Sequence, residues 1–287
     1  MEIRVIETTI NEDNSTRTIF RDFISPENFA ILEEEIRKME ELIFIKQLSQ
    51  YVEDNESDIF NQVALFIEYL RNGITTMFSF RRSDKDEISN ITNRLLLNYL
   101  GSIKTFIDHT ETFLTRKFGD QSDQLIIYKK LLSRYYDQHF VYRFFYHLRN
   151  YAQHVRNPID HFNLSLKVRS EAEMVEGSLD ICFDRDSLLN HYGKWKHVEG
   201  DLRSKEAVFE VLPLISEMTV LILEITEEIE KIIKEEVLRS GQAILDIVKV
   251  SPSIEKEIAV AYNIETDANG KFSGYECVEI PIVYFLT

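Results

Sequence analysis

Most of the chain places apolar residues three or four positions apart, which is the period of an amphipathic helix. The first such stretch follows the letters SPENF, where Ser25 suits the N-cap and Pro26 the first helical position. Pro158 and the restricted residue before it are expected to end the fourth helix. The pattern predicts helices at about 25–51, 58–71, 87–117, 122–158 and 204–248, the last with a kink at Pro213.

Shorter stretches alternate apolar and polar residues with a period of two, which is typical of strands with one buried face. Near the start of the chain, Ile3 and Val5 alternate with Arg4. We expect strand pairs at 2–23, at about 162–184 around Gly177, and in the tail around Asn269-Gly270.

Together these elements predict a mainly α fold, with a helical body and peripheral β-hairpins at both termini and after the fourth helix. The expected divisions are an N-terminal strand pair at 1–24, a helical body at 25–248 with a β-hairpin inserted at about 162–184, and a C-terminal β-hairpin extension at 249–287. The sequence has no internal repeat, low-complexity segment or Pro/Gly-rich linker.

Composition and the absence of known motifs exclude several classes of protein. No run approaches the ~18 apolar residues that a membrane span needs, and the first residues lack a signal-peptide pattern, so we expect a cytoplasmic protein without a membrane partner. Cys182 and Cys277 stand far apart, which indicates neither a zinc site nor a disulfide framework. The sequence also lacks a P-loop, a GxSxG elbow and a dinucleotide fingerprint, so we expect no cofactor.

One group of residues has the chemistry of metal ligands without their spacing. His191, Trp195 and His197 lie close together in the sequence, but no Cys or acid stands at a convincing distance from the histidines. We therefore expect a surface loop there and no metal site.

Charge is distributed unevenly along this acidic chain. The net charge of −16 argues against a general nucleic-acid coat protein, because affinity for the phosphate backbone comes from clustered Lys and Arg. Between Arg116 and Arg156, however, eight Lys and Arg stand against three Asp, a local net charge of +5. A basic island in an acidic protein points to a localised anion site.

The segment YRFFYHLRNYAQHVRNP, from Tyr142 to Pro158, lies in this island and separates into two faces on a helix of about 100° per residue. The apolar face collects Phe140, Val141, Phe144, Phe145, Leu148, Tyr151, Ala152 and Val155. The polar face collects His139, Tyr142, Arg143, Tyr146, His147, Arg149, Asn150, Gln153 and His154, and has no carboxylate. An ordinary solvated face mixes charges of both signs. This face therefore suits an anion, or, as the plainer alternative, Arg and His side chains that reach water or pair with acids of another helix.

The letters LRNYAQH within this segment resemble the signature of the HEPN superfamily, small helical domains found in many prokaryotic RNases, toxins and phage-defence proteins. The signature is Arg, a short spacer and then His, often with a polar residue directly after the Arg, and Arg149, Asn150 and His154 match it. Other Arg/His pairs in the chain have a similar spacing, but only Arg149 and His154 also have the polar second residue and an uninterrupted predicted helix. The resemblance covers about Ser25–Pro158 and the helix after Ser204.

The resemblance implies a helical bundle that forms a homodimer, and metal-independent cleavage of RNA in a toxin or phage-defence setting. In that reaction the ribose 2′-OH attacks the adjacent phosphate and leaves a cyclic phosphate end and a 5′-OH end. Arg149 and His154 point about 140° apart on one helix, so a composite site would need both copies. His154 is suited to move the proton, Arg149 to bind the phosphate charge, and Asn150 to orient His154 or hold a phosphate oxygen.

Further residues of the polar face are expected to bind RNA, namely Arg143, Tyr146, His147 and Gln153, with tyrosine stacking on an unpaired base. An antitoxin or defence protein is a further expected partner. Two alternatives stay open: a non-catalytic module of the same architecture that binds a nucleotide, RNA or a protein, and a purely structural helical protein whose hairpins dock partners.

Overall fold

The computed structural model describes residues 2–10, 16–74, 82–169, 174–250, 256–266, 268 and 272–281. Within these residues the fold is mainly α, with seven helices and two small antiparallel sheets. The helices are α1 (Pro26–Ile74), α2 (Arg82–Phe118), α3 (Asp123–Gln138), α4 (Phe140–His154), α5 (Arg185–His191), α6 (Val198–Ser204) and α7 (Leu212–Val248). The strands are β1 (Arg4–Ile10), β2 (Thr16–Phe23), β3 (Ile159–Arg169), β4 (Met174–Asp184), β5 (Val208–Glu210), β6 (Lys256–Thr266) and β7 (Phe272–Ile280). No helix in the described ranges is both long and apolar enough to cross a membrane.

The chain divides into two compact units. The first comprises Met1–Phe44 and Glu230–Thr287, and the second Ile45–Ile229. The long helices α1 and α7 each contribute one part to either unit. All of the candidate site residues belong to the second unit.

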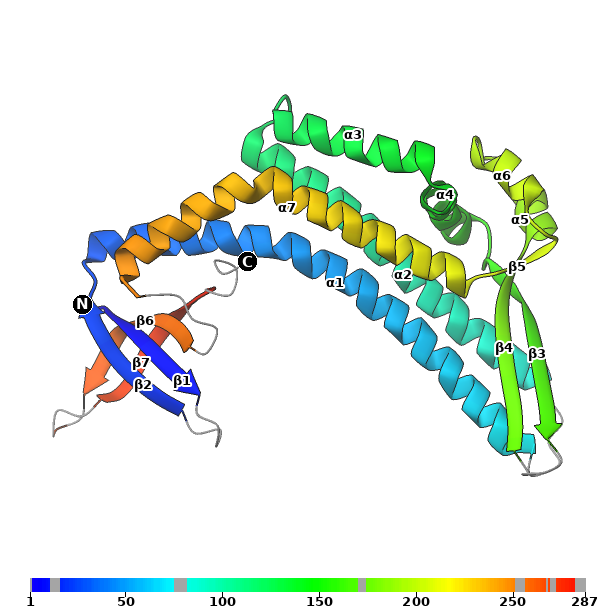
Figure 1. Cartoon of the computed structure of the whole chain (residues 1–287), viewed down its shortest axis with the longest axis horizontal. Coiled ribbons are helices and arrows are strands. Elements are labelled where there is room, and N and C mark those ends of the chain that lie inside the picture. The colour runs from blue at the N-terminus through cyan, green and yellow to red at the C-terminus, as the bar shows by residue number, and fades with distance from the viewer. Residues whose placement is uncertain are drawn as a thin grey trace. The chain divides into compact units, whose positions relative to one another are not determined.

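The first unit is built on a four-stranded antiparallel sheet in the order β2-β1-β6-β7 (Figure 1). Strands from opposite ends of the sequence pair directly in it, with Val5 opposite Val260. The predicted alternation holds at Ile3 and Val5, which are buried, but Glu7 on the same strand is also buried. Its carboxylate accepts a hydrogen bond of 2.9 Å from Arg21 on β2, which compensates the buried charge. The turn predicted at Asn269-Gly270 lies outside the described residues.

The second unit has an aromatic core formed by rings of α2, α3 and α4, and the hydroxyl of Tyr99 in this core hydrogen-bonds to Ile215 and Thr219 in the first part of α7. Its fully buried rings include Tyr99, Phe106, Tyr128, Phe144 and Phe145. The sheet β3-β4-β5 packs on α4 through Phe144, whose ring centroid lies 5.4 Å from Phe183 of β4 and 6.0 Å from Phe209 of β5. These contacts fix one side of α4 and leave the other side for the candidate site.

The predicted gap between the first two helices is wrong, because α1 runs without a break from Pro26 to Ile74. The polar run after Tyr51 contains neither Gly nor Pro, and buried Val52 and Ile59 continue the apolar stripe across it. One of its acids is also used, since Glu56 accepts a hydrogen bond of 2.8 Å from Ser216 of α7.

The predicted helix 122–158 is in fact two helices, α3 and α4, separated at His139. This residue has extended backbone angles (φ −113°, ψ 116°), and its ring stacks on Tyr135 with centroids 5.3 Å apart. No Gly or Pro marks the break, so packing of the second helix against the core overrides the local helical pattern. Helix α4 then ends at His154, before Pro158 is reached.

Two further boundaries differ from the sequence expectations. The helix predicted from Ser204 begins at Leu212, after β5, so Pro213 stands in the first turn, where its missing N–H is not needed and it causes no kink. Gly177 lies within β4 opposite Leu166, not at the turn of the hairpin, and residues 170–173 between the strands lie outside the described residues.

The chain leaving α4 is anchored by Asn93 of α2, which is 1% exposed. The Asn93 side chain donates a hydrogen bond of 2.7 Å to the Ile159 carbonyl and accepts one of 3.0 Å from the Ile159 N–H. One amide side chain thus satisfies both backbone groups of the residue at which β3 begins, directly after Pro158. This anchor fixes the direction in which the chain leaves the candidate site.

Candidate functional site

Arg143, in the first turn of α4, is held by protein groups on three sides. Its Nη1 donates hydrogen bonds to the carbonyls of Tyr136 (2.8 Å) and Asp137 (2.7 Å), which belong to the last turn of α3. Its Nη2 donates to the Asp201 carboxylate of α6 at 2.9 Å. Arg143 therefore satisfies carbonyls that a helix end leaves without partners, and it joins α3, α4 and α6. The structure gives this predicted RNA ligand a protein-bound position.

His147, one turn further along α4, is buried and only 3% exposed. Its Nε2 lies 3.0 Å from the Tyr136 hydroxyl of α3, within hydrogen-bond distance. Burial lowers the pKa of His147, and the positive charges of Lys196 and His197 lower it further. Because these effects favour the neutral imidazole, His147 lacks both the exposure and the charge that an RNA phosphate would need.

The two faces of α4 are therefore less cleanly separated than the sequence predicts. Tyr142 and His147 were assigned to the polar face and are buried, whereas Val155, assigned to the apolar face, is 40% exposed. Helix α3 contributes to both: the Tyr136 hydroxyl lies 3.0 Å from His147 Nε2, and the Tyr135 ring packs on the Tyr142 ring with centroids 6.4 Å apart.

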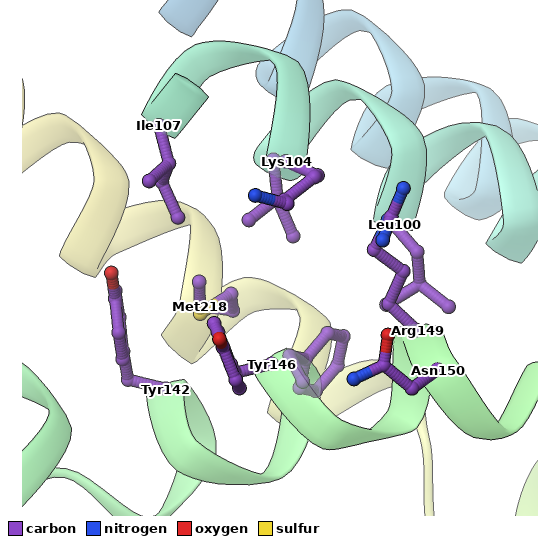
Figure 2. Close-up of a pocket in the computed structure, with 10 residues that line it drawn as sticks. Leu100, Lys104, Ile107, Tyr142, Tyr146, Arg149, Asn150 and Met218 are labelled. Carbon is purple, nitrogen blue, oxygen red and sulfur yellow. The ribbon is translucent and has the colours of Figure 1, made fainter. Parts of the chain in front are cut away.

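The remaining part of the polar face borders a small cavity of about 50 Å³ between α2, α4 and α7 (Figure 2). It is lined by Leu100, Ile103, Lys104, Ile107, Tyr142, Phe145, Tyr146, Arg149, Asn150 and Met218. Small-molecule pockets usually measure roughly 300–1,000 Å³, so this cavity suits one small group of a ligand but not a whole nucleotide.

Arg149 brings an unsatisfied positive group to this cavity. Its side chain extends from α4 toward α2 beside Leu100 (Figure 2). The Nε atom is buried and has no hydrogen-bond partner among the described residues. A buried donor without an acceptor costs about 1–3 kcal/mol, and more when the group is charged. An anion that supplies the acceptor would recover this free energy on binding.

The charge of the cavity lining is positive. None of the ten lining residues is acidic, and the two charged ones are Arg149 and Lys104. Lys104 forms an ion pair with Asp108 one turn along α2, whereas Arg149 forms no ion pair with the described residues. The cavity therefore favours a negatively charged group close to Arg149.

Asn150 and Tyr146 complete the accessible part of this site. Asn150 lines the cavity next to Arg149 and is partly exposed. Tyr146 is half exposed, and its ring meets those of Tyr136 and His147 edge-to-face, with centroids 5.9 Å and 5.3 Å away. A ring that is supported from behind and open in front is suited to stack on an unpaired base.

His154 and Gln153 lie apart from the cavity, at the end of α4. Both are exposed, and neither lines the cavity. His154 is the last residue of α4, five positions and therefore about 140° around the helix from Arg149. A single chain thus brings Arg149 and Asn150 together but does not bring His154 to them.

Five lining residues were not among the candidates from the sequence. Helix α2 supplies four of them, Leu100, Ile103, Lys104 and Ile107, and α7 supplies Met218, and all five sit in ordinary amphipathic stretches without a motif. Their proximity to Arg149 results from helix packing between distant parts of the chain, which a local pattern does not encode.

The loop with His191 and His197 contains a core residue. Trp195 is 1% exposed, its ring stacks near Phe144, and its indole N–H donates a hydrogen bond of 3.0 Å to the Leu188 carbonyl. His191 lies with its Nδ1 2.7 Å from the Ser187 carbonyl. Across the described ranges, no group of three or more His, Cys, Asp or Glu is placed to hold a metal ion.

Comparisons of the chain with protein-family models, with curated proteins and with solved structures find no match.

Proposed function

We propose that the chain is an endoribonuclease of HEPN type that cleaves RNA as a homodimer without a metal ion, in a toxin or defence setting. The observation that carries the proposal is the buried, unpartnered Nε of Arg149, a residue that lines the cavity together with Asn150 and Lys104, and none of the lining residues is acidic. A phosphodiester supplies the acceptor oxygens and the negative charge that this cavity lacks.

The proposed reaction is an internal transesterification. The ribose 2′-oxygen forms a bond to the adjacent phosphorus, and the bond from phosphorus to the 5′-oxygen breaks. Arg149 stabilises the charge on the non-bridging oxygens, and His154 takes the proton of the 2′-OH or gives one to the departing 5′-oxygen. These two groups supply the charge and the proton transfer from the protein itself, which is why the proposal needs no metal.

A composite site follows from the geometry of α4. Arg149 and His154 of one chain point about 140° apart, so we propose that Arg149 of one copy and His154 of the other act on the same phosphate. Tyr146 would stack on a base next to that phosphate, and exposed Gln153 would lie along the RNA.

The test uses single-stranded RNA in the presence of EDTA with the wild type, Arg149→Ala, His154→Ala and the control Asn157→Ala, which changes an exposed residue after α4 that has no role in the proposed site. We expect cyclic or 3′-phosphate ends and 5′-OH ends from the wild type and the control. Each of the other variants should lose at least about 100-fold in rate while keeping its circular dichroism spectrum. Cleavage by both variants at the wild-type rate would refute the assignment of the site.

Mixing the two inactive variants tests the composite site directly. A dimer of Arg149→Ala with His154→Ala keeps one intact pair, so an equal mixture should regain about a quarter of the wild-type sites after subunit exchange. If the mixture stays inactive although its subunits are shown to exchange, Arg149 and His154 do not form a site across two copies. They would then act within one copy or have unrelated roles.

A second candidate is a non-catalytic module of the same architecture that binds RNA or a nucleotide without cleaving it. The observation that favours it is the small cavity, together with the engagement of Arg143 and His147 by protein groups, which leaves a short basic surface. RNA binding that depends on Arg149 but yields no cleavage products would support this second function.

A further inference from the structure

The outer face of α3 combines exposed apolar and basic side chains. Ile126 and Ile127 are 39% and 52% exposed. Lys130 and Arg134 are exposed and form no ion pair with the described residues, whereas their neighbour Lys129 pairs with Glu111 of α2 at 3.0 Å. We call Ile126, Ile127, Lys130 and Arg134 the α3 patch.

The four residues of the α3 patch form one continuous surface. Ile126, Lys130 and Arg134 follow each other at intervals of four along the helix, and Ile127 projects beside them. The opposite side of α3 buries Leu125, Tyr128, Leu131 and Tyr135 in the core. A shallow depression of about 610 Å³ lies over the outer face, and Asp137 is the one acidic residue among those that line it.

This surface is unfavourable while it faces water. Cations four residues apart on a helix repel each other by about 0.2–0.5 kcal/mol. Arg134 does have a neighbouring ring, Tyr135, whose centroid lies 5.6 Å from its guanidinium carbon, but that contact neutralises no charge. The chain carries a net charge of −16, yet no described acid pairs with Lys130 or Arg134. A partner with carboxylates beside apolar side chains would neutralise the cations and cover both isoleucines at once.

We propose that the α3 patch binds an acidic amphipathic helix of a partner protein, with Glu or Asp opposite Lys130 and Arg134 and aliphatic residues against Ile126 and Ile127. RNA fits the patch less well. Its phosphates would pair with the cations, but Ile126 and Ile127 have no aromatic ring on which a base could stack. The proposal is independent of the proposed nuclease, since none of the four residues lines the Arg149 cavity.

The experiment measures fluorescence anisotropy of a labelled helical peptide of about 18 residues, with Leu on one face and Glu on the other. A scrambled peptide of the same composition keeps the charge and removes the apolar face. The proteins are the wild type, Lys130→Glu with Arg134→Glu, Ile126→Ser with Ile127→Ser, and the control Lys85→Glu with Arg94→Glu. The control changes an exposed Lys and an exposed Arg on α2 and gives the same net charge as the first double variant.

We expect the wild type to bind the amphipathic peptide at least about tenfold more tightly than the scrambled one. Both double variants in α3 should weaken that binding by about tenfold or more, and the control by less than about twofold. All variants should keep the circular dichroism spectrum of the wild type, because the substituted side chains face solvent.

Four results would overturn the proposal. Equal affinity for the scrambled peptide would show a simple polyanion site, and single-stranded RNA that displaces the peptide from the α3 patch with equal affinity would favour a nucleic-acid surface. If the α3 variants bind the amphipathic peptide as tightly as the wild type, or if the wild type does not bind it, the α3 patch is not a site for an acidic amphipathic helix. RNA cleavage is measured with the same variants. If they cleave RNA at the wild-type rate, a negative peptide result counts against the α3 patch alone and leaves the nuclease proposal standing.

Discussion

Arg143 and Arg149 stand on the same helix, six residues apart, and their guanidinium groups have opposite surroundings. Arg143 donates to two carbonyls of α3 and to the Asp201 carboxylate, so its charge and hydrogen bonds are satisfied within the protein. Arg149 has a buried Nε without an acceptor in the described chain and borders a cavity without acidic residues. The first arginine holds helices together, and the second is the one that we propose to bind a phosphate.

The difference arises from the neighbours of α4 and not from its own sequence. One half of the polar face, with Arg143 and His147, lies against the end of α3 and against α6, which supply carbonyls, a tyrosine hydroxyl and a carboxylate. The other half, with Tyr146 and Arg149, faces α2 and α7, which supply mainly apolar side chains to the cavity. A helix face that is uniform in residue type thus divides into a structural half and a half to which we assign the proposed site.

The largest expected effect separates the two arginines by stability. Arg143→Ala should lower the free energy of unfolding by about 2–4 kcal/mol, because it removes charge-assisted bonds and leaves two helix-end carbonyls without donors. Arg149→Ala should lower it by no more than about 1 kcal/mol, since no protein hydrogen bond is lost and a buried donor without an acceptor is removed. Urea unfolding of both variants, followed by circular dichroism, measures the difference.

Arg143→Lys refines the same comparison. Lysine keeps the charge but lacks the forked guanidinium that reaches three acceptors. We therefore expect Arg143→Lys to lower the free energy of unfolding, but by less than Arg143→Ala does. Equal stability of Arg143→Ala and Arg149→Ala would contradict the division of the polar face into two halves.

A smaller effect is expected at the anchor that follows α4. Asn93→Ala should lower the free energy of unfolding by about 2 kcal/mol, because it leaves the buried N–H and carbonyl of Ile159 without partners. Thermal or urea unfolding checks this. Asn90→Ala, which changes an exposed Asn on the same helix, serves as the control and should stay within about 0.5 kcal/mol of the wild type.

The smallest effect concerns pH and the structural half. Burial, with the nearby positive charges of Lys196 and His197, lowers the pKa of His147 in the folded protein. The unfolded chain therefore binds a proton at His147 at higher pH than the folded protein does. The contribution of His147 to stability is complete above the unfolded pKa of about 6.5 and decreases as the pH falls below it.

His147→Gln removes this titration while keeping a polar group near the Tyr136 hydroxyl. Between about pH 7.5 and pH 5.5, the wild type should lose more unfolding free energy than the variant does. Urea unfolding curves at both pH values give the comparison, and parallel losses would show that His147 does not titrate as its buried position indicates.

Much of the fold was predictable from local patterns. The alternation at Ile3 and Val5 identified a buried strand face, and the helical period located α2 within a few residues of its observed ends. The helix break at His139 was not predictable, since no residue there disfavours a helix and the break depends on packing against the core. The continuity of α1 was missed for a related reason, because buried Val52 and Ile59 outweigh the polar residues between them.

The candidate site was predictable only as a set of residue types on one helix. The helical pattern assigns Arg143, His147 and Arg149 to the same polar face, and nothing in the sequence distinguishes their surroundings. It contains no local signal that Asp201 lies opposite the first or that Tyr136 lies opposite the second. It also did not point to Lys104, which reaches the cavity from α2. These facts depend on contacts between residues far apart in the sequence.

The pairing of β1 with β6 has a consequence for how the protein is made. Val5 and Val260 are partners in one sheet although 255 residues separate them, so β1 is synthesised long before its neighbour β6. At about 5–20 residues per second this delay is roughly 13–50 s, during which β1 and β2 form at most an isolated hairpin of marginal stability. During translation, one edge of β1 is therefore exposed to other nascent chains, and its folding should depend on chaperone supply more than that of the second unit.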